Sequence, residues 1–265
     1  MATLFVKQAK DYSLARPHYP QQLFQFIASK TLQHDLAWDV GTGSGQAAES
    51  LAGIYKNVIA TDTSEAQLEF APKLPNIQYK RTPPKLTMEE LKLTVAQEST
   101  IDVITVAQAV HWFDLSTFYQ EAKCVLKRPH GVMAVWCYTN PRVNKTMDQI
   151  FDRFYAKDCG PYWDMTGIGL IDDEYRTLEF PFEPVEGLDH TGPFQFKSEK
   201  KIDLEDIFAF IKSWSAYQTA KDKGIELLRE EVVEEFEKAW KKDGDGQKVA
   251  SFPIHLRIGK VGKMI

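Results

Sequence analysis

The sequence predicts an α/β fold built on a doubly wound, mostly parallel sheet. Over residues 31–138, short apolar segments alternate with amphipathic helical segments, the order that produces parallel strands with helices on both faces. The first strand segment runs into alternating glycines at positions 41, 43 and 45, and the second ends in Asp62. A strand, a glycine loop, a helix and a second strand ending in an acid are typical of a nucleoside-binding βαβ unit.

The elements of this alternation can be placed in order along the chain. A helix is expected at 21–31, because Leu23, Phe24 and Ile27 recur at helical spacing after Pro20. The segments that follow are a strand at 36–40, a helix at 47–55, strands at 58–62 and 76–79, a helix at 88–95, a strand at 103–107, a helix at 117–126 and a strand at 132–136. Five strands alternating with helices argue for a parallel sheet with crossover helices.

Beyond Tyr138 the pattern changes, since residues 141–189 are rich in aromatic residues, prolines and glycines. We expect an insertion over the sheet edge, with a helix near 147–155 and a strand at 176–182. Helices at 203–213 and 224–240 and a last strand at 252–261 complete the chain. We predict one domain with four parts: an N-terminal lid segment (1–30), a cofactor-binding core (31–138), a substrate cap of helices and loops (139–240) and a terminal strand (241–265).

Composition excludes several classes of partner. The formal net charge is -5 and the basic residues form no stripe, which argues against nucleic acid as a substrate. The three cysteines, Cys124, Cys137 and Cys159, show no C-x-x-C spacing, so we expect a reduced compartment and no metal site. No signal peptide and no apolar run of about 18 residues stands out. We therefore expect a cytoplasmic protein without a membrane partner that acts on a small molecule, and leave a homodimer open.

The glycine loop narrows the choice of nucleoside ligand. Glycines permit positive φ and let a ligand approach the backbone, and Asp62 is placed to accept hydrogen bonds from the two hydroxyls of a ribose. A dinucleotide fingerprint would need a glycine where Gln46 stands, and no Gly-Lys-Ser/Thr triplet completes a phosphate loop. The spacing therefore favours a nucleoside ligand that is neither a dinucleotide nor a nucleoside triphosphate.

The pattern acid-x-G-x-G-x-G, which begins at Asp39, resembles motif one of the class I S-adenosylmethionine (SAM)-dependent methyltransferases. The segments 11–20, 101–113 and 131–136 extend the likeness to small-molecule methyltransferases of the trans-aconitate, ubiquinone-biosynthesis and plant embryo-abundant types. The resemblance is good over roughly the first 140 residues. It implies SAM as cofactor and a seven-stranded Rossmann-like sheet with an antiparallel last strand.

The resemblance also implies a set of cofactor-binding residues. The glycine loop would surround the methionine and ribose parts of SAM, and the entry segment around Arg16 would fold over them. One departure concerns adenine: related sequences often carry an acid after the third strand, where this chain has residues 80–84 without one. Adenine would then be recognised by the backbone or in an altered way. The implied cofactor-binding residues are Arg16, Tyr19, Asp39, Gly41, Thr42, Gly43, Gly45, Asp62, Thr63, Ala107 and Gln108.

Methyl transfer is a displacement at a carbon that the sulfonium already activates, so it requires orientation more than a protein nucleophile. A hydroxyl or protonated nitrogen acceptor would need a base, for which His111 is the candidate; a carboxylate would need none. The alternative is that His111 is a packed, hydrogen-bonded residue. Aromatic residues that could wall the acceptor pocket, or equally belong to the core, are Trp112, Trp136, Tyr138, Trp163, Trp214 and Tyr217.

The predicted function is therefore methyl transfer from SAM to an oxygen, nitrogen or carboxylate of a small metabolite. Two alternatives remain at this point. The fold could keep SAM or its demethylated product while catalysing another step, such as a cyclisation. It could also be a noncatalytic protein that uses the same pocket to sense a nucleoside.

Overall fold

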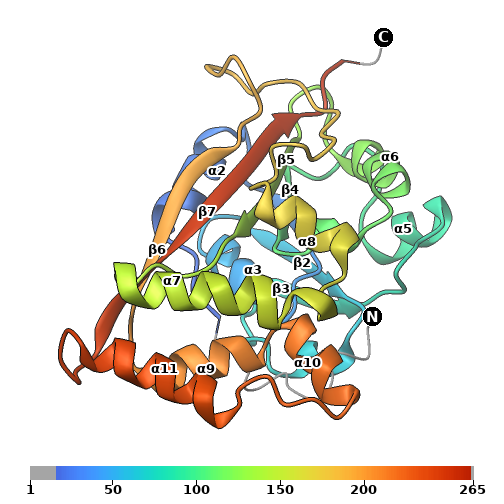
Figure 1. The fold of residues 1–265 in the computed structure, drawn as a ribbon. Helices are drawn as coiled ribbons and strands as arrows, with labels where there is room; N and C mark the ends of the chain where they lie inside the picture. The colour runs from blue at the N-terminus through green and yellow to red at the C-terminus, as the bar shows by residue number, and fades with distance from the viewer. Residues whose placement is uncertain (1–15, 264–265) are drawn as a thin grey trace.

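Seven strands form one sheet in a computed structural model that describes residues 16–263. The strand order is β3-β2-β1-β4-β5-β7-β6 (Figure 1). Neighbours among the first five strands are parallel, and β7 runs antiparallel to both β5 and β6. The strands are β1 (Leu36–Val40), β2 (Asn57–Asp62), β3 (Ile77–Arg81), β4 (Val103–Ala107), β5 (Val132–Tyr138), β6 (Phe194–Ile202) and β7 (Lys248–Lys260). The predicted seven-stranded, doubly wound sheet with an antiparallel last strand is confirmed.

Helices cover both faces of the parallel part of the sheet and create two apolar cores. Successive side chains of a strand point to opposite faces, so Ala37 of β1 packs with Leu23 and Leu51 on one face. Its neighbour Trp38 packs with Leu91 and Phe118 on the other. The helices of this region are α2 (Gln21–Ser29), α3 (Gln46–Ala52), α4 (Glu65–Glu69), α5 (Met88–Thr94) and α6 (Leu115–Val125).

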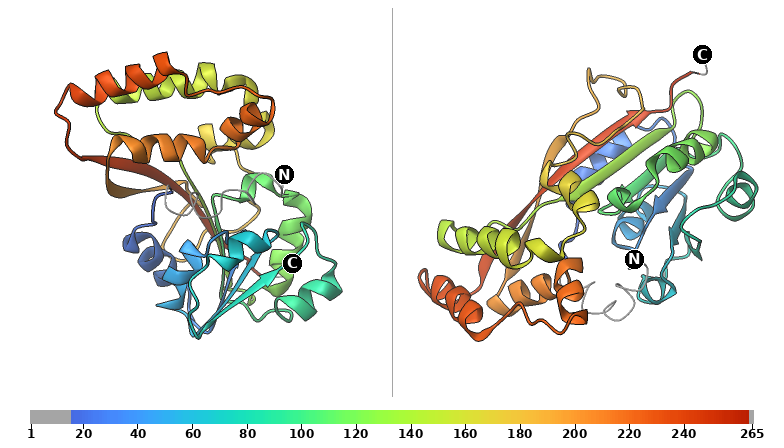
Figure 2. Two further views of the ribbon diagram at one scale, coloured as in Figure 1. Left: turned by 90° about the horizontal axis from the view of Figure 1, so that it is seen from below. Right: turned by 45° about the vertical axis from the view of Figure 1, so that its right-hand side comes forward.

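A second group of helices forms a cap beyond the carboxyl end of β5. Tyr138, the last residue of β5, pairs with Ile254, and β7 continues past this point to the pair Lys248 and Ile202. This extension of β6 and β7 carries the cap, which stands apart as a separate layer (Figure 2, left). The cap helices are α7 (Lys145–Arg153), α8 (Met165–Asp172), α9 (Leu204–Lys212), α10 (Ser215–Asp222) and α11 (Glu230–Lys241), with short turns η4 (Phe154–Asp158) and η5 (Gly160–Tyr162).

The C-terminal half differs from the sequence prediction in two places. The strand expected at 176–182 is wrong: no strand forms there, and Phe180 and Phe182 instead pack around the ring of Tyr119. The sequence missed β6, whose residues alternate in burial but carry lysine and glutamate on the exposed side, as is common in an edge strand. The prediction for residues 1–15 of the lid segment lies outside the described residues. Within 16–263, no helix is long and apolar enough to cross a membrane.

Candidate active site

Two adjacent cavities open at the carboxyl ends of the parallel strands. The first, of about 350 Å³, lies over β1, β2 and β4 and is lined by residues 41–44, 61–64, 82–86 and 107–109. The second, of about 390 Å³, lies between the sheet end and the cap. Four residues line both cavities: Arg16, Gln108, Trp112 and Tyr138. The two cavities therefore adjoin at these four residues, which we call the shared wall.

Asp39 supports the glycine loop from below. Its carboxylate accepts hydrogen bonds from the hydroxyls of Thr105 at 2.6 Å and Thr42 at 2.5 Å. The side chain is completely buried and does not line the first cavity, and burial raises its pKa to about 6. The prediction of direct cofactor contact is therefore wrong for Asp39. Its carboxylate instead holds Thr42, which does line the cavity, in place.

The glycines of the loop have two different roles. Gly41 and Gly43 line the first cavity, whereas Gly45 does not. Gly45 has φ +81°, and a Cβ atom there would lie 2.6 Å from the hydroxyl oxygen of Tyr79. A side chain at this position would therefore be strained and would collide with β3. Gly45 is needed for packing of the loop and not for contact with a ligand.

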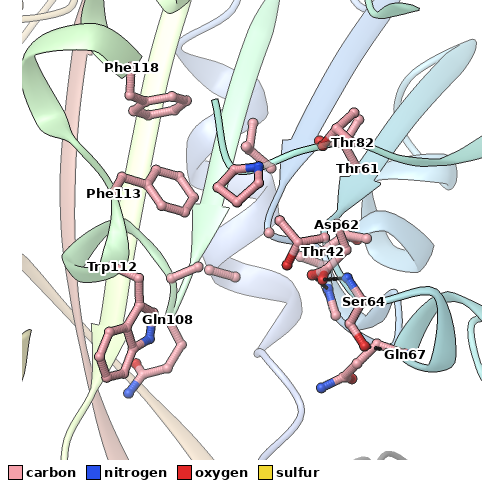
Figure 3. Close-up of a pocket in the computed structure, with 18 of the residues that line it drawn as sticks. Thr42, Thr61, Asp62, Ser64, Gln67, Thr82, Gln108, Trp112, Phe113 and Phe118 are labelled. Carbon is pink, nitrogen blue, oxygen red and sulfur yellow. Dashed lines mark hydrogen bonds between the residues drawn. The ribbon is translucent and has the colours of Figure 1, made fainter. Parts of the chain in front are cut away.

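Asp62 combines a structural and a binding role at the end of β2. Its two carboxylate oxygens accept hydrogen bonds from the backbone N–H groups of Gly43 and Ser64, both at 2.8 Å. The residue lines the first cavity beside Thr63, and burial raises the pKa of its carboxyl. Each carboxylate oxygen has a second lone pair. Asp62 can therefore accept two further hydrogen bonds from a ligand in the cavity (Figure 3).

Gln67 is a cavity residue that sequence reasoning missed. Ser64 caps α4 by accepting a hydrogen bond from the N–H of Gln67 at 3.4 Å, as its position predicts. The side-chain amide of Gln67, however, lines the first cavity, and its oxygen is buried without a hydrogen-bond partner among residues 16–263. Its place three residues after the cap suggested a capping role only. The amide oxygen is instead available to a ligand.

Gln108 is fixed at the shared wall by the backbone of β5. The backbone of Gln108 has a φ of +53°, which is unusual for a residue other than glycine. Its amide oxygen accepts a hydrogen bond from the N–H of Tyr138 at 2.8 Å, and its amide nitrogen donates to the carbonyl of Tyr138 at 3.4 Å. The amide therefore prolongs the pairing of β4 with β5. Figure 3 shows Gln108 and Trp112 side by side on one wall of the first cavity.

Arg16 joins the sheet to the cap. Its guanidinium donates to the hydroxyl of Tyr138 at 2.6 Å and to the carbonyl of Ser213 at 2.9 Å, and lies 5.2 Å from the ring centre of Phe210. Tyr19 lines the first cavity and packs edge-on against Trp136 at 5.3 Å. The entry segment therefore reaches the cavities with a cation and a phenol, and a role of Arg16 and Tyr19 in cofactor binding stays a prediction.

His111 lies in the second cavity beside the shared wall. Its Nδ1 is 2.8 Å from the hydroxyl of Tyr175, and burial lowers its pKa to about 3, so the ring is neutral. The described residues offer that hydroxyl no acceptor other than Nδ1, which favours the tautomer with the ring proton on Nε2. Because Nε2–H is a donor, this geometry argues against the predicted base and favours a hydrogen-bonding role.

The aromatic candidates separate into cavity walls and core. Trp112 and Tyr138 line both cavities, and Trp163 and Trp214 line the second. Trp136 is completely buried, packs on Phe24 and lines neither cavity, so its predicted role as a pocket wall is wrong. The reason is that a strand residue points to one face of the sheet even when it lies near the carboxyl end. Tyr217 also lines neither cavity and hydrogen-bonds to Glu226.

Known proteins resemble this chain in sequence and in structure. A family model described as a methyltransferase domain matches residues 38–135. A protein of Dictyostelium discoideum described as a methyltransferase is 32% identical over 257 residues, which cover 95% of this chain and 92% of that protein. A yeast protein, from Saccharomyces cerevisiae, described as an S-adenosylmethionine-dependent methyltransferase is 26% identical and covers 79% of each chain.

The structural likeness extends over the cap as well as the sheet. A solved structure described as a type II methyltransferase from Anaeromyxobacter dehalogenans superposes with a TM-score of 0.78 and 28% sequence identity. The match covers 94% of this chain and 99% of that chain. Sequence and structure therefore indicate the same family.

Proposed function

The chain belongs to the class I SAM-dependent methyltransferases, and we propose that it methylates an oxygen or nitrogen atom of a small metabolite bound in the second cavity. SAM is the cofactor of this family. When bound, it supplies a methyl group that its sulfonium has already activated. The chain must bind the cofactor, bind the acceptor and hold the two in contact with water excluded from between them.

The residues of the first cavity fit SAM. The two unused lone pairs of Asp62 suit the hydroxyls of a ribose, and the backbone at Gly41 and Gly43 is open to the cavity. The buried amide oxygen of Gln67 offers a further acceptor next to Gly43. At the shared wall, the Arg16 guanidinium suits the carboxylate of the methionine part. Asp62, Gly41, Gly43, Gln67 and Arg16 are therefore the residues that we propose hold SAM.

The observation that carries the proposal is the shared wall. A sulfonium that lies against Gln108, Trp112 and Tyr138 would face directly into the second cavity, because these residues line both spaces. The indole of Trp112 would add a cation–π attraction. Trp163 and Trp214, whose ring centres are 5.5 Å apart, give the second cavity an apolar wall. Such a wall excludes water from the methyl group and packs against an organic acceptor.

The charges around the shared wall favour an acceptor that arrives with an available lone pair. His111 is neutral and its favoured tautomer donates through Nε2, Arg16 is a cation, and the Gln108 amide is engaged with β5. None of these three groups takes up a proton near neutral pH. A carboxylate oxygen needs no base, so we propose a carboxylate as the acceptor group that fits this arrangement best.

The experiment that tests the function has two steps. Calorimetry of the full-length protein with SAM and with S-adenosylhomocysteine first measures binding, for which we expect micromolar or tighter affinity. Incubation with methyl-labelled SAM and a panel of small carboxylic acids, phenols and amines then measures transfer. Label in a carboxylate ester supports the proposal. Binding without label in any product would favour the nonmethylating or nucleoside-sensing alternative, and no binding would overturn the cofactor assignment.

A further inference from the structure

The first cavity has a far end, away from the shared wall, that the proposed function does not use. If the sulfonium faces the second cavity and the ribose lies on Asp62, the adenine ring must extend to the opposite end. That end is formed by residues 82–86, which follow β3, and by Phe113 and α6. In Figure 3, Phe113 and Phe118 lie on one side of this space and Thr82 on the other. The far end therefore has flat apolar walls suited to a purine.

The loop after β3 offers little to the polar edge of adenine. Residues 80–86 contain no acid, and Pro83 and Pro84 have no backbone N–H. The exocyclic amine of adenine is a hydrogen-bond donor, so burying it without an acceptor would cost binding free energy. The loop can offer this amine only its backbone carbonyl oxygens and the hydroxyl of Thr82, so a carboxylate acceptor must come from another element of the cavity wall.

Glu121 of α6 has the properties of that acceptor. It lines the first cavity, its exposed fraction is 7%, and its Oε1 is buried with no hydrogen-bond partner in the described part of the chain. The backbone N–H of Leu86, in the loop after β3, lies close enough to the carboxyl group to lower its pKa. Buried carboxylate oxygens without partners are uncommon in folded proteins. Burial raises the pKa of this carboxyl, because removal from water destabilises its charged form.

The neighbouring acid in the same wall is partly exposed, since 42% of its side chain is accessible to solvent. Asp114 accepts hydrogen bonds from Lys85 at 2.8 Å and from Thr117 at 3.1 Å. Asp62 lies at the ribose position. Of these three acids, Glu121 is the one that retains a buried oxygen for a ligand.

We propose that Glu121 accepts a hydrogen bond from the exocyclic amine of the adenine in SAM, and that this contact makes the site selective for adenine. The acid that is missing after β3 is thus supplied by α6, whose Glu121 lies beside Leu86 of that loop. The inference rests on the proposed placement of SAM in the first cavity. It goes further by naming a side chain that reads the base.

The test compares S-adenosylhomocysteine with S-inosylhomocysteine, in which an oxygen replaces the amine. Calorimetry on the full-length protein should give an affinity at least about tenfold higher for the adenosyl compound, the size of one hydrogen bond to a charged group. In Glu121→Gln, the adenosyl compound should bind more weakly and the inosyl compound more tightly, because the amide can donate to the new oxygen. The ratio of the two affinities should fall toward one.

Glu89→Gln is the matched control, since it makes the same chemical change at an exposed position in the first turn of α5. Its affinity ratio should equal that of the wild type. A wild-type protein that binds both compounds equally overturns the Glu121 assignment, even if the variant does not fold. So does an unchanged ratio in a folded Glu121→Gln protein. Failure of both compounds to bind the wild type would overturn the placement of SAM as well, which distinguishes the two proposals.

Discussion

The two cavities are built in different ways. The first is formed mainly by short runs of chain at the ends of β1, β2 and β4, where backbone groups and the carboxylate of Asp62 border the cavity. The second is formed by side chains from the entry segment, the sheet end and the cap, among them Arg16, His111 and Trp214. The shape of the first cavity, where we propose that SAM binds, thus depends on the backbone, whereas that of the second, the proposed acceptor site, depends on which side chains the cap brings to the sheet.

The largest effect should come from the glycine loop beside the first cavity. We expect Gly45→Ala to lower the free energy of unfolding by about 2–4 kcal/mol, because it adds left-handed strain to overpacking against Tyr79. Urea denaturation measures the change. Gly224→Ala is the control, since Gly224 also has positive φ but a Cβ atom there would meet no other atom within 4 Å among residues 16–263. It should lose only about 1–2 kcal/mol. Equal losses would show that packing around the glycine loop is not tight.

The next effect concerns the carboxylate of the first cavity. Asp62→Ala should weaken binding of S-adenosylhomocysteine by about 100-fold, because two hydrogen bonds to the ribose are lost. The variant also loses the acceptor for the N–H groups of Gly43 and Ser64, so its fold is checked by circular dichroism. Calorimetry gives the affinity. A folded Asp62→Ala protein with wild-type affinity would contradict the placement of the ribose.

The third prediction concerns His111 in the second cavity. Its pKa of about 3 in the folded protein lies below the value of about 6.5 for an unfolded chain. As the pH falls below about 6.5, the imidazole of His111 is protonated in the unfolded chain but not in the folded protein. This proton uptake lowers the free energy of unfolding. The free energy of unfolding of the wild type should decrease there by up to about 1.4 kcal/mol per pH unit more steeply than that of His111→Gln.

Nitrogen-15 NMR provides an independent measurement of the same group. The wild type should show the imidazole proton on Nε2 of His111, and Tyr175→Phe should allow the other tautomer by removing the hydroxyl that donates to Nδ1. A proton on Nδ1 in the wild type would restore His111 as a candidate base. Parallel pH dependence of stability in wild type and His111→Gln would show that the ring is not neutralised by burial.

The smallest effect should come from a carboxylate of the second cavity. Asp152 lines that cavity and pairs with Arg142 at 2.6 Å in an exposed position. Asp152→Asn should change the free energy of unfolding by less than about 1 kcal/mol and leave the affinity for S-adenosylhomocysteine within about twofold. It is the counterpart of Asp62→Asn, which we expect to weaken the same binding. Equal effects at the two positions would remove the division of roles between the cavities.

Much of the parallel core could be predicted from the sequence because its signals are local. The strands that end at Ala107 and Asp62 lie where apolar runs meet polar or glycine residues. The cap was harder to predict, since β6 is an exposed edge strand with a weak apolar pattern. The direction of Trp136 was misjudged because position along a strand does not determine which face of the sheet a side chain occupies.

By itself, the sequence determined the order of strands and helices in the core, the glycine loop and the acid at the end of β2, because turn residues and apolar periodicity act over a few neighbours. Only the tertiary structure decided that Asp39 is buried under the loop, that Tyr175 orients His111, and that Glu121 reaches the far end of the first cavity. These contacts join residues distant in sequence, and their geometry depends on how the helices pack on the sheet.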